Sequence, residues 1–109
     1  MQESDTTLSR LYAVILSRKT ADPKSSYTAQ LMAGGVTLIA KKMGEEAVEL
    51  ALAAVGRDPT QVVNESADLL YHLLVLWAEA GIAPDVVLAE LFRRQGRSGL
   101  TEKASRGMD

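Results

Sequence analysis

The chain has 109 residues, a length that suits one domain, and a net charge of −2, which says little about its partners. It contains no cysteine, which excludes a disulfide framework, a thiolate zinc site and a cysteine nucleophile and fits a reducing compartment. The few aromatic residues are not interleaved with the basic ones, so we expect no nucleic-acid binding.

The N-terminus lacks the basic-then-apolar layout of a signal peptide. The longest strongly apolar stretch, Leu69–Ala78, is far shorter than a membrane span. We therefore expect a cytoplasmic protein with no membrane partner.

Helical periodicity runs through the chain, and no window shows the alternation of a strand bounded by hairpin turns, which predicts an all-α fold. The predicted elements are a helix over about Thr6–Ser17, a linker Ala21–Tyr27, a short turn capped by Thr28 that stops at Gly34-Gly35, a helix Val36–Val55, a helix Pro59–Ala80, and a segment from Pro84 to about Arg94. The residues from Gln95 onward are rich in Gly and Ser and are predicted to be irregular or to become ordered only under some conditions.

The helix boundaries rest on local end signals. Gly56 and Gly81 are typical of helix C-termini, and Asp58 before Pro59 is typical of an N-cap followed by proline at the first helical position. We expect one domain over residues 1–109: an antiparallel bundle of four to five helices completed by subunit association. Residues 1–25 would be an N-terminal helix and linker, and residues 96–109 a basic tail.

The charge is unevenly distributed. From Arg93 to Asp109 there are five basic and two acidic residues, whereas residues 1–92 carry seven basic against twelve acidic. An acidic body with a basic tail could hold a metal ion in the body and an anion near the tail. A solvated C-terminal segment is the simpler interpretation of composition alone.

Two short acidic clusters lie in helices that are otherwise almost entirely apolar. They are Glu45, Glu46 and Glu49 in KKMGEEAVEL, and Glu65 and Asp68 in NESADLLYH. The short loop between the two helices makes them antiparallel neighbours. Glu49 and Glu65 each lie about seven residues from that loop, so they fall at the same height and the two clusters can face each other.

Carboxylates brought together in this way raise one another's pKa values or demand cations. Mg²⁺ meets that demand, because it takes oxygen ligands, keeps several waters and completes its shell with substrate phosphates. Two such ions could bridge a pyrophosphate linkage and lower the pKa of an attacking water. Lys41 or Lys42, and the basic tail, could supply positive charge to the phosphates.

Alternative interpretations remain for single residues. A single Glu-x-x-Glu pair most often belongs to an exposed face of a helix. Two such clusters at the same height on neighbouring helices favour a metal site instead. His72 shares a stripe with Glu65 and Asp68, and a lone histidine there is more often a hydrogen-bonded interior residue than a ligand. The residue three before it is Leu69, which argues against a di-iron site.

The string EEAVE followed by ESAD resembles the Glu-Glu-x-x-Glu … Glu-x-x-Asp signature of the all-α nucleotide pyrophosphohydrolases. The surrounding strings are similar to the phosphoribosyl-ATP pyrophosphatase family of histidine biosynthesis, over about residues 26–106: SYTAQLMAGG, IAKKMGEEAVELALAA, ESADLLYHLLVLWAEAGI and RRQGRSGLTEKASR. The resemblance implies Mg²⁺-dependent hydrolysis of phosphoribosyl-ATP to phosphoribosyl-AMP and pyrophosphate. It also implies subunits that associate at least as a homodimer.

Carried onto this chain, the resemblance implies metal ligands at Glu45 or Glu46, Glu49, Glu65 and Asp68. A glutamate among these that is not fully engaged, or a metal-bound hydroxide, would activate the attacking water. The resemblance also implies substrate contacts from Lys41 and Lys42, and contacts of Lys103 and Arg106 with substrate or a neighbouring subunit. Two rival functions are a house-cleaning pyrophosphohydrolase of free nucleoside triphosphates and a non-catalytic helical dimerisation module.

Overall fold

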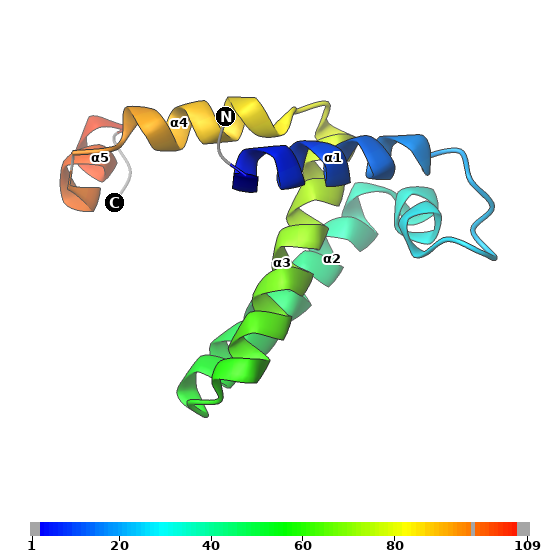
Figure 1. The fold of residues 1–109 in the computed structure, drawn as a ribbon, viewed down its shortest axis with the longest axis horizontal. Helices are drawn as coiled ribbons and strands as arrows, with labels where there is room; N and C mark the ends of the chain where they lie inside the picture. Colours follow the sequence, from blue (N-terminus) through cyan, green and yellow to red (C-terminus); the bar gives the residue numbers. More distant parts are fainter. Residues whose placement is uncertain (1–2, 97, 107–109) are drawn as a thin grey trace.

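The computed structural model describes residues 3–96 and 98–106, which form five helices and no strand. The helices are α1 (Glu3–Ser17), α2 (Tyr27–Val55), α3 (Pro59–Ala80), α4 (Pro84–Arg93) and α5 (Gly99–Ser105). Helices α2 and α3 run side by side as an antiparallel pair, which we call the arm; α1 and α4 cross its upper end, and α5 lies at the far end of α4 (Figure 1). The predicted all-α class is confirmed.

Both ends of α3 lie where the local signals predict them. The Asp58 side chain accepts hydrogen bonds from the backbone N–H groups of Thr60 and Gln61, and Pro59 occupies the first turn. Gly81 ends the helix with φ 74 and ψ 28, the left-handed conformation that glycine adopts without steric cost. These caps determine where α3 begins and ends.

Helix α2 is bent at Gly35, whose φ of 77 and ψ of −175 lie outside the helical region. This conformation is essentially restricted to glycine, which explains why the predicted break falls here. The segment before the bend is capped by Ser26, whose hydroxyl accepts a hydrogen bond from a backbone N–H of the first turn at 3.1 Å. The prediction of Thr28 as the cap is wrong: its side chain is buried and hydrogen-bonds the Tyr71 hydroxyl.

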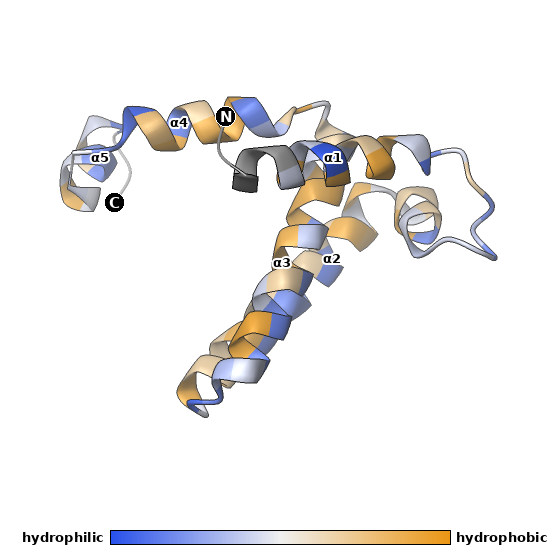
Figure 2. Ribbon diagram, in the orientation of Figure 1, coloured by the Kyte–Doolittle hydropathy of each residue, from blue (hydrophilic) through white to orange (hydrophobic). Residues whose placement is uncertain are grey.

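The hydrophobic core lies where α1 crosses the upper end of the arm. Its fully buried members are Ile15 from α1, Leu31 and Ile39 from α2, and Leu74, Val75 and Ala78 from α3. Further down, α2 and α3 pack against one another, and many residues of both helices are apolar there (Figure 2). The large exposed apolar side chains of the arm are Val36, Val48, Leu52, Val55, Val63 and Leu70.

Of the two states predicted for the tail, the irregular one is wrong for Gly99–Ser105, which form α5. Ser98 caps this helix, and Glu102, only 3% exposed, holds it against the end of α4. The Glu102 Oε2 atom lies 2.7 Å from Arg93 Nη2 and 3.4 Å from Arg106 Nε. A buried carboxylate needs such partners, and because they come from different segments the tail's composition does not reveal them.

Within the described ranges, no single helix is long and apolar enough to cross a membrane. Helices α3 and α4 would qualify together by length and composition alone, but they meet at a bend of 109°.

Candidate metal centre

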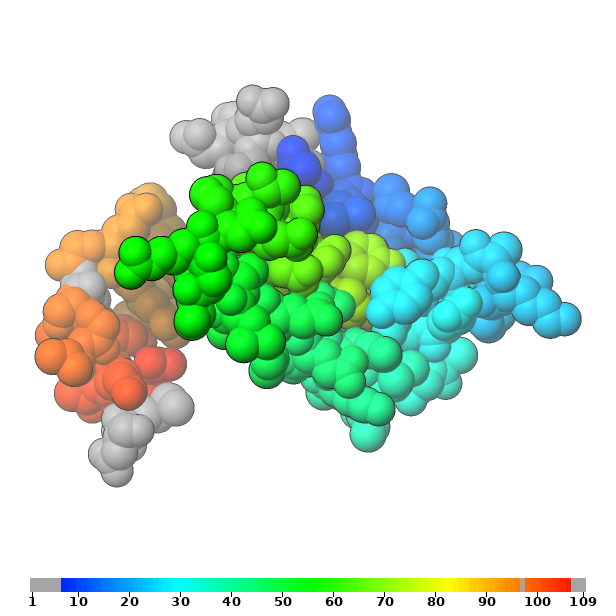
Figure 3. Space-filling view, turned by 90° about the horizontal axis from the view of Figure 1, so that it is seen from below, coloured from blue at the N-terminus to red at the C-terminus, as the bar shows by residue number. Residues whose placement is uncertain are grey.

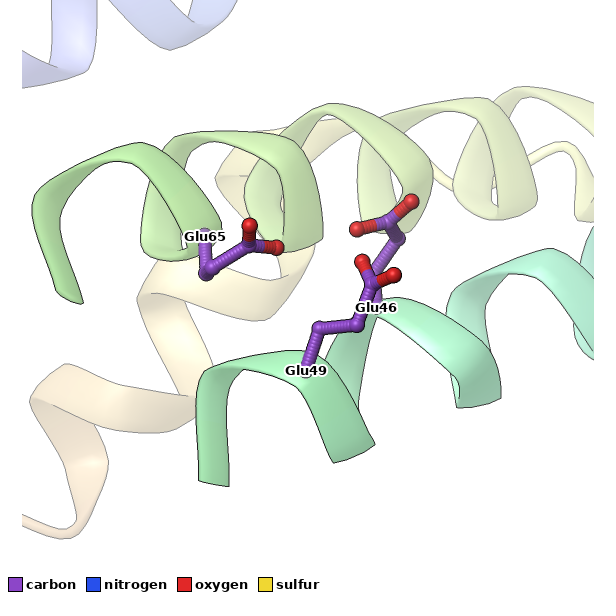
Figure 4. A group of neighbouring side chains, drawn as sticks. All are labelled: Glu46, Glu49 and Glu65. Atoms are coloured by element: carbon purple, nitrogen blue, oxygen red, sulfur yellow. The ribbon is translucent and has the colours of Figure 1, made fainter. Parts of the chain in front are cut away.

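Three glutamate side chains from two helices converge partway along the arm (Figure 4). Glu46 and Glu49 lie three residues apart on α2 and therefore on one side of it, and Glu65 comes from α3. One carboxylate oxygen of each lies within 4.8 Å of the others. Around a single bound cation, opposite oxygen ligands are about 4.2–5.2 Å apart, so the three side chains are spaced to share one ion.

Crowding of these carboxylates raises the pKa values of two of them, Glu46 and Glu65. The hydrogen bond between the Glu46 and Glu49 carboxyl groups, followed by burial and neighbouring charges, raises the pKa of Glu46 to about 7. Burial, followed by the charge of Glu49, also raises the pKa of Glu65. The cluster therefore tends to keep a proton near neutral pH, and a cation binding there would displace it.

Two oxygens in the group lack a partner among the described residues. Glu46 Oε2 and Glu65 Oε2 are both buried and accept no hydrogen bond there. A buried acceptor with no donor costs free energy, so such atoms point to something that should bind them. Because the donor set consists of carboxylate oxygens, the residues present fit a hard divalent cation such as Mg²⁺.

Two other predicted carboxylates lie outside the group of three. Asp68, on α3, is exposed, although its charge contributes to the raised pKa values of Glu46 and Glu65. Glu45 is exposed and pairs with Lys42, whose Nζ lies 3.4 Å from Glu45 Oε1. The structure therefore distinguishes Glu46 from Glu45, which the sequence left open.

The predicted basic residues divide into two locations. Lys42 lies on α2 one turn before Glu46, and Lys41 beside it is exposed. Lys103 belongs to α5 and Arg106 caps it, and α5 lies at the far end of α4, away from the lower arm (Figure 1). Within one chain, therefore, the tail is not brought to the carboxylates.

The cluster can be reached from the surface of the arm. An open hollow of about 370 Å³ lies beside Glu49 and Glu65, and another of about 460 Å³ lies beside Glu45 and Glu49. The first extends toward the loop between α2 and α3, where Asp58 and Gln61 line it. A ligand held at the carboxylates would have room along the arm on either side.

The sequence patterns missed one residue next to the site. The Tyr27 hydroxyl lies 2.9 Å from His72 Nε2, and His72 Nδ1 lies 2.7 Å from the Asp68 carbonyl oxygen. His72 is 5% exposed and bonded through both nitrogens, in agreement with the interior role favoured for it. Tyr27 carries no signal of its own, because only the bend at Gly35 returns the start of α2 to α3.

The chain was compared with known proteins. A family model described as phosphoribosyl-ATP pyrophosphohydrolase matches residues 8–95, most of the chain. The chain belongs to the phosphoribosyl-ATP pyrophosphohydrolase family. The matched range contains the whole carboxylate cluster and ends before α5.

Three curated relatives of this family match over more than 90% of their length. A phosphoribosyl-ATP pyrophosphatase of Parvibaculum lavamentivorans is 62% identical over 100 residues, covering 92% of each chain. Relatives with the same name from Paramagnetospirillum magneticum and Azospirillum brasilense are 55% identical over 106 residues and 52% identical over 103 residues. These matches cover 97% of each chain in the first case, and 94% of this chain and 93% of the relative in the second.

Proposed function

We propose that this chain is a Mg²⁺-dependent hydrolase that converts phosphoribosyl-ATP to phosphoribosyl-AMP and pyrophosphate in histidine biosynthesis. The observation that carries the proposal is the convergence of Glu46, Glu49 and Glu65, two of which present buried oxygens without hydrogen-bond partners. Membership of the family, and the names of its curated relatives, support the choice of substrate. We take residues 1–109 as one pyrophosphohydrolase domain located in the cytoplasm.

Glu46, Glu49 and Glu65 would hold the ion, and Asp68, about one turn after Glu65 on α3, would add a fourth carboxylate. When bound, Mg²⁺ would supply positive charge that offsets the charge of the substrate phosphates and of the departing pyrophosphate. A metal ion at this position would also give the two partnerless glutamate oxygens their missing interaction.

The chain's own residues would orient the phosphates and move the proton. Lys42 offers positive charge one turn before Glu46, on the side of α2 that carries the cluster, and the exposed Lys41 beside it would add to that charge. A carboxylate oxygen not engaged by the ion, from among the cluster residues and the adjacent Glu45, would accept the proton of the attacking water. A carboxylate with a raised pKa is better suited to this role at neutral pH than an ordinary one.

We further propose that the chain acts at least as a homodimer. Its accessible surface is 7474 Å², whereas a compact monomer of 11.7 kDa exposes about 5,900 Å². The excess of about 1,600 Å² exceeds the roughly 800 Å² per partner that a standard interface buries. Figure 3 shows α5, in orange to red, on one side of the molecule. Because α5 lies at the far end of α4 (Figure 1), Lys103 and Arg106 would contact a neighbouring subunit or the substrate bound there.

Pyrophosphate release tests the proposed function. The full-length chain should release pyrophosphate from phosphoribosyl-ATP much faster than from any common nucleoside triphosphate, and only with a divalent cation present. Equal rates across a nucleotide panel would favour a house-cleaning pyrophosphohydrolase instead. No pyrophosphate release, together with no Mg²⁺-dependent rise in Tm, would favour a non-catalytic dimerisation module.

A further inference from the structure

A chain of two hydrogen bonds lies at one end of the line that Glu65, Asp68 and His72 form along α3. It runs from the Tyr27 hydroxyl to His72 Nε2, and from His72 Nδ1 to the Asp68 carbonyl oxygen, over distances of 2.9 and 2.7 Å. His72 is buried, whereas Tyr27 is 46% exposed. The inner end of the chain is therefore fixed in the protein interior, and the outer end can reach a bound ligand.

The direction of these hydrogen bonds follows from the group at the inner end. A carbonyl oxygen can only accept, so His72 Nδ1 must carry the hydrogen. In the neutral ring Nε2 is then an acceptor, and the Tyr27 hydroxyl donates to it. With its only hydrogen directed inward, the Tyr27 oxygen keeps lone pairs that can accept a hydrogen bond from outside the chain.

Aromatic packing holds Tyr27 in this position. Its ring stacks on Tyr71, with ring centroids 6.2 Å apart and planes inclined by 23°, and meets the His72 ring edge-on at 5.7 Å. The Tyr71 ring makes this contact, while its hydroxyl bonds Thr28 and takes no part in the stacking. Locked neighbours of this kind preorganise a binding group, because it loses little freedom when the ligand arrives.

Tyr27 also lies next to the proposed site. Its partner His72 lies one helical turn after Asp68 on α3 and bonds the Asp68 carbonyl oxygen, so two hydrogen bonds link the Tyr27 hydroxyl to a residue of the proposed metal site. Ionised phosphates cannot donate a hydrogen bond to it. The donors of a nucleotide are its sugar hydroxyls and the amino or N–H groups of its base.

We propose that Tyr27 is a specificity-determining residue that accepts a hydrogen bond from a donor on the nucleoside portion of the substrate, and that His72 is the positioning residue that directs the Tyr27 oxygen toward it. The inference rests on the proposed function, because it adds a contact with the nucleoside to a site whose other residues bind only the metal ion and the phosphates. Its role is in substrate binding and not in the chemical step.

Steady-state kinetics with phosphoribosyl-ATP tests the inference through the split between KM and kcat. Tyr27→Phe removes the acceptor and keeps the ring, so KM should rise about ten-fold while kcat stays within about two-fold of wild type. His72→Asn keeps a donor for the Asp68 carbonyl oxygen but loses the partner of Tyr27, so KM should rise in the same way. His72→Gln can place a carbonyl oxygen near the position of Nε2 and should restore a KM within about two-fold of wild type.

Tyr71→Phe is the matched control. It removes a hydroxyl that bonds Thr28 but keeps the ring that stacks on Tyr27, so the packing that holds Tyr27 remains. Tyr71→Phe should lower Tm and leave KM unchanged. An unchanged KM in Tyr27→Phe, or an equal rise in Tyr71→Phe, would overturn the inference. A wild-type chain that releases no pyrophosphate would overturn the proposed function, and this inference with it.

Substrate analogues identify which group of the substrate donates the hydrogen bond to Tyr27. If Tyr27 accepts from a ribose hydroxyl, an analogue lacking that hydroxyl should bind wild type and Tyr27→Phe equally well. If the ten-fold difference persists when the hydroxyls of both riboses of phosphoribosyl-ATP are removed in turn, the donor is on the base. Either pattern supports the nucleoside contact.

Discussion

Glu45 and Glu49 lie one helical turn apart on α2 and have different partners. Glu45 pairs with Lys42 at the surface, whereas Glu49 joins Glu46 and Glu65 within 4.8 Å. The two positions share chemistry, helix and exposure class, so they form a matched pair for testing which carboxylates hold an ion.

We expect Glu49→Gln to abolish the Mg²⁺-dependent rise in Tm and to lower kcat/KM by at least about 100-fold, because it removes a charged ligand from the centre of the cluster. Glu45→Gln should keep the Mg²⁺-dependent rise in Tm. Differential scanning fluorimetry across a Mg²⁺ titration, with pyrophosphate release measured in parallel, checks both. A full Mg²⁺ response in Glu49→Gln would show that the ion binds elsewhere.

The raised pKa of Glu46 makes the metal-free chain sensitive to pH. Its pKa is about 7 in the folded chain against an ordinary value of 4.5. A group with a raised folded-state pKa contributes stability that is fully present below the unfolded value and is lost as pH rises through the folded value. Without divalent cations, Tm should therefore fall between pH 5 and pH 8.

Thermal melts at several pH values in a chelator, and again in saturating Mg²⁺, measure this effect. Mg²⁺ should raise Tm more at pH 8 than at pH 5. Without metal, the Tm of Glu46→Gln should depend less on pH than the Tm of wild type. A metal-free Tm that does not change over this range would contradict the crowding of these carboxylates.

The spacing of residues predicted part of this site and could not have predicted the rest. Counting from the loop placed Glu49 opposite Glu65, because an antiparallel helix pair has a fixed rise per residue. The choice between Glu45 and Glu46 depends on how α2 is rotated against α3, which packing decides. The contact of Tyr27 with His72 spans 45 positions and depends on a bend in the chain, so no local pattern reveals it.

At the scale of elements, α3 and α5 show the same limit. The ends of α3 follow from Asp58, Pro59 and Gly81, whose effects are local. The seven residues of α5 are too few to form a stable helix alone. They are held by Glu102 against Arg93, a contact nine residues away that composition cannot indicate.

The bend in α2 gives a prediction at this scale. We expect Gly35→Ala to destabilise the fold by about 1–3 kcal/mol, since a side chain at φ 77 and ψ −175 is strained even though nothing lies within 4 Å of the added Cβ. Urea unfolding followed by circular dichroism measures the change. Gly99→Ala is the control, because the Cβ there also meets nothing and φ is not positive; it should be near neutral. Equal effects of the two substitutions would mean that the bend stores no strain.

The whole molecule is more open than its length requires. Its radius of gyration is 15.7 Å, compared with about 13 Å for a compact chain of this size. Gly44, Val48 and Leu52 are spaced four apart on one side of α2, and a Cβ added at Gly44 would meet nothing within 4 Å. A glycine in mid-helix costs about 1 kcal/mol relative to alanine, and close approach of another helix would explain its presence.

We expect Leu52→Glu to shift the chain from dimer or higher oligomer toward monomer, because it places a charge on this apolar stripe at a residue that is 67% exposed in one copy. Sedimentation velocity at several protein concentrations measures the shift. Val86→Glu on α4 is the control, since Val86 is comparably exposed at 62% but lies off the arm. A wild-type chain that sediments as a monomer would remove the basis for the proposed association.

Only residues 56–58 separate α2 from α3, which has a consequence for how the chain folds. Closing so short a connection loses little entropy, so this hairpin can form before the more distant crossings of α1 and α4. The first native contacts would then bring several glutamates of α2 and α3 close together before most of the hydrophobic core has formed to offset their repulsion. A nascent chain in this situation would fold faster where ambient counterions screen or bridge that repulsion.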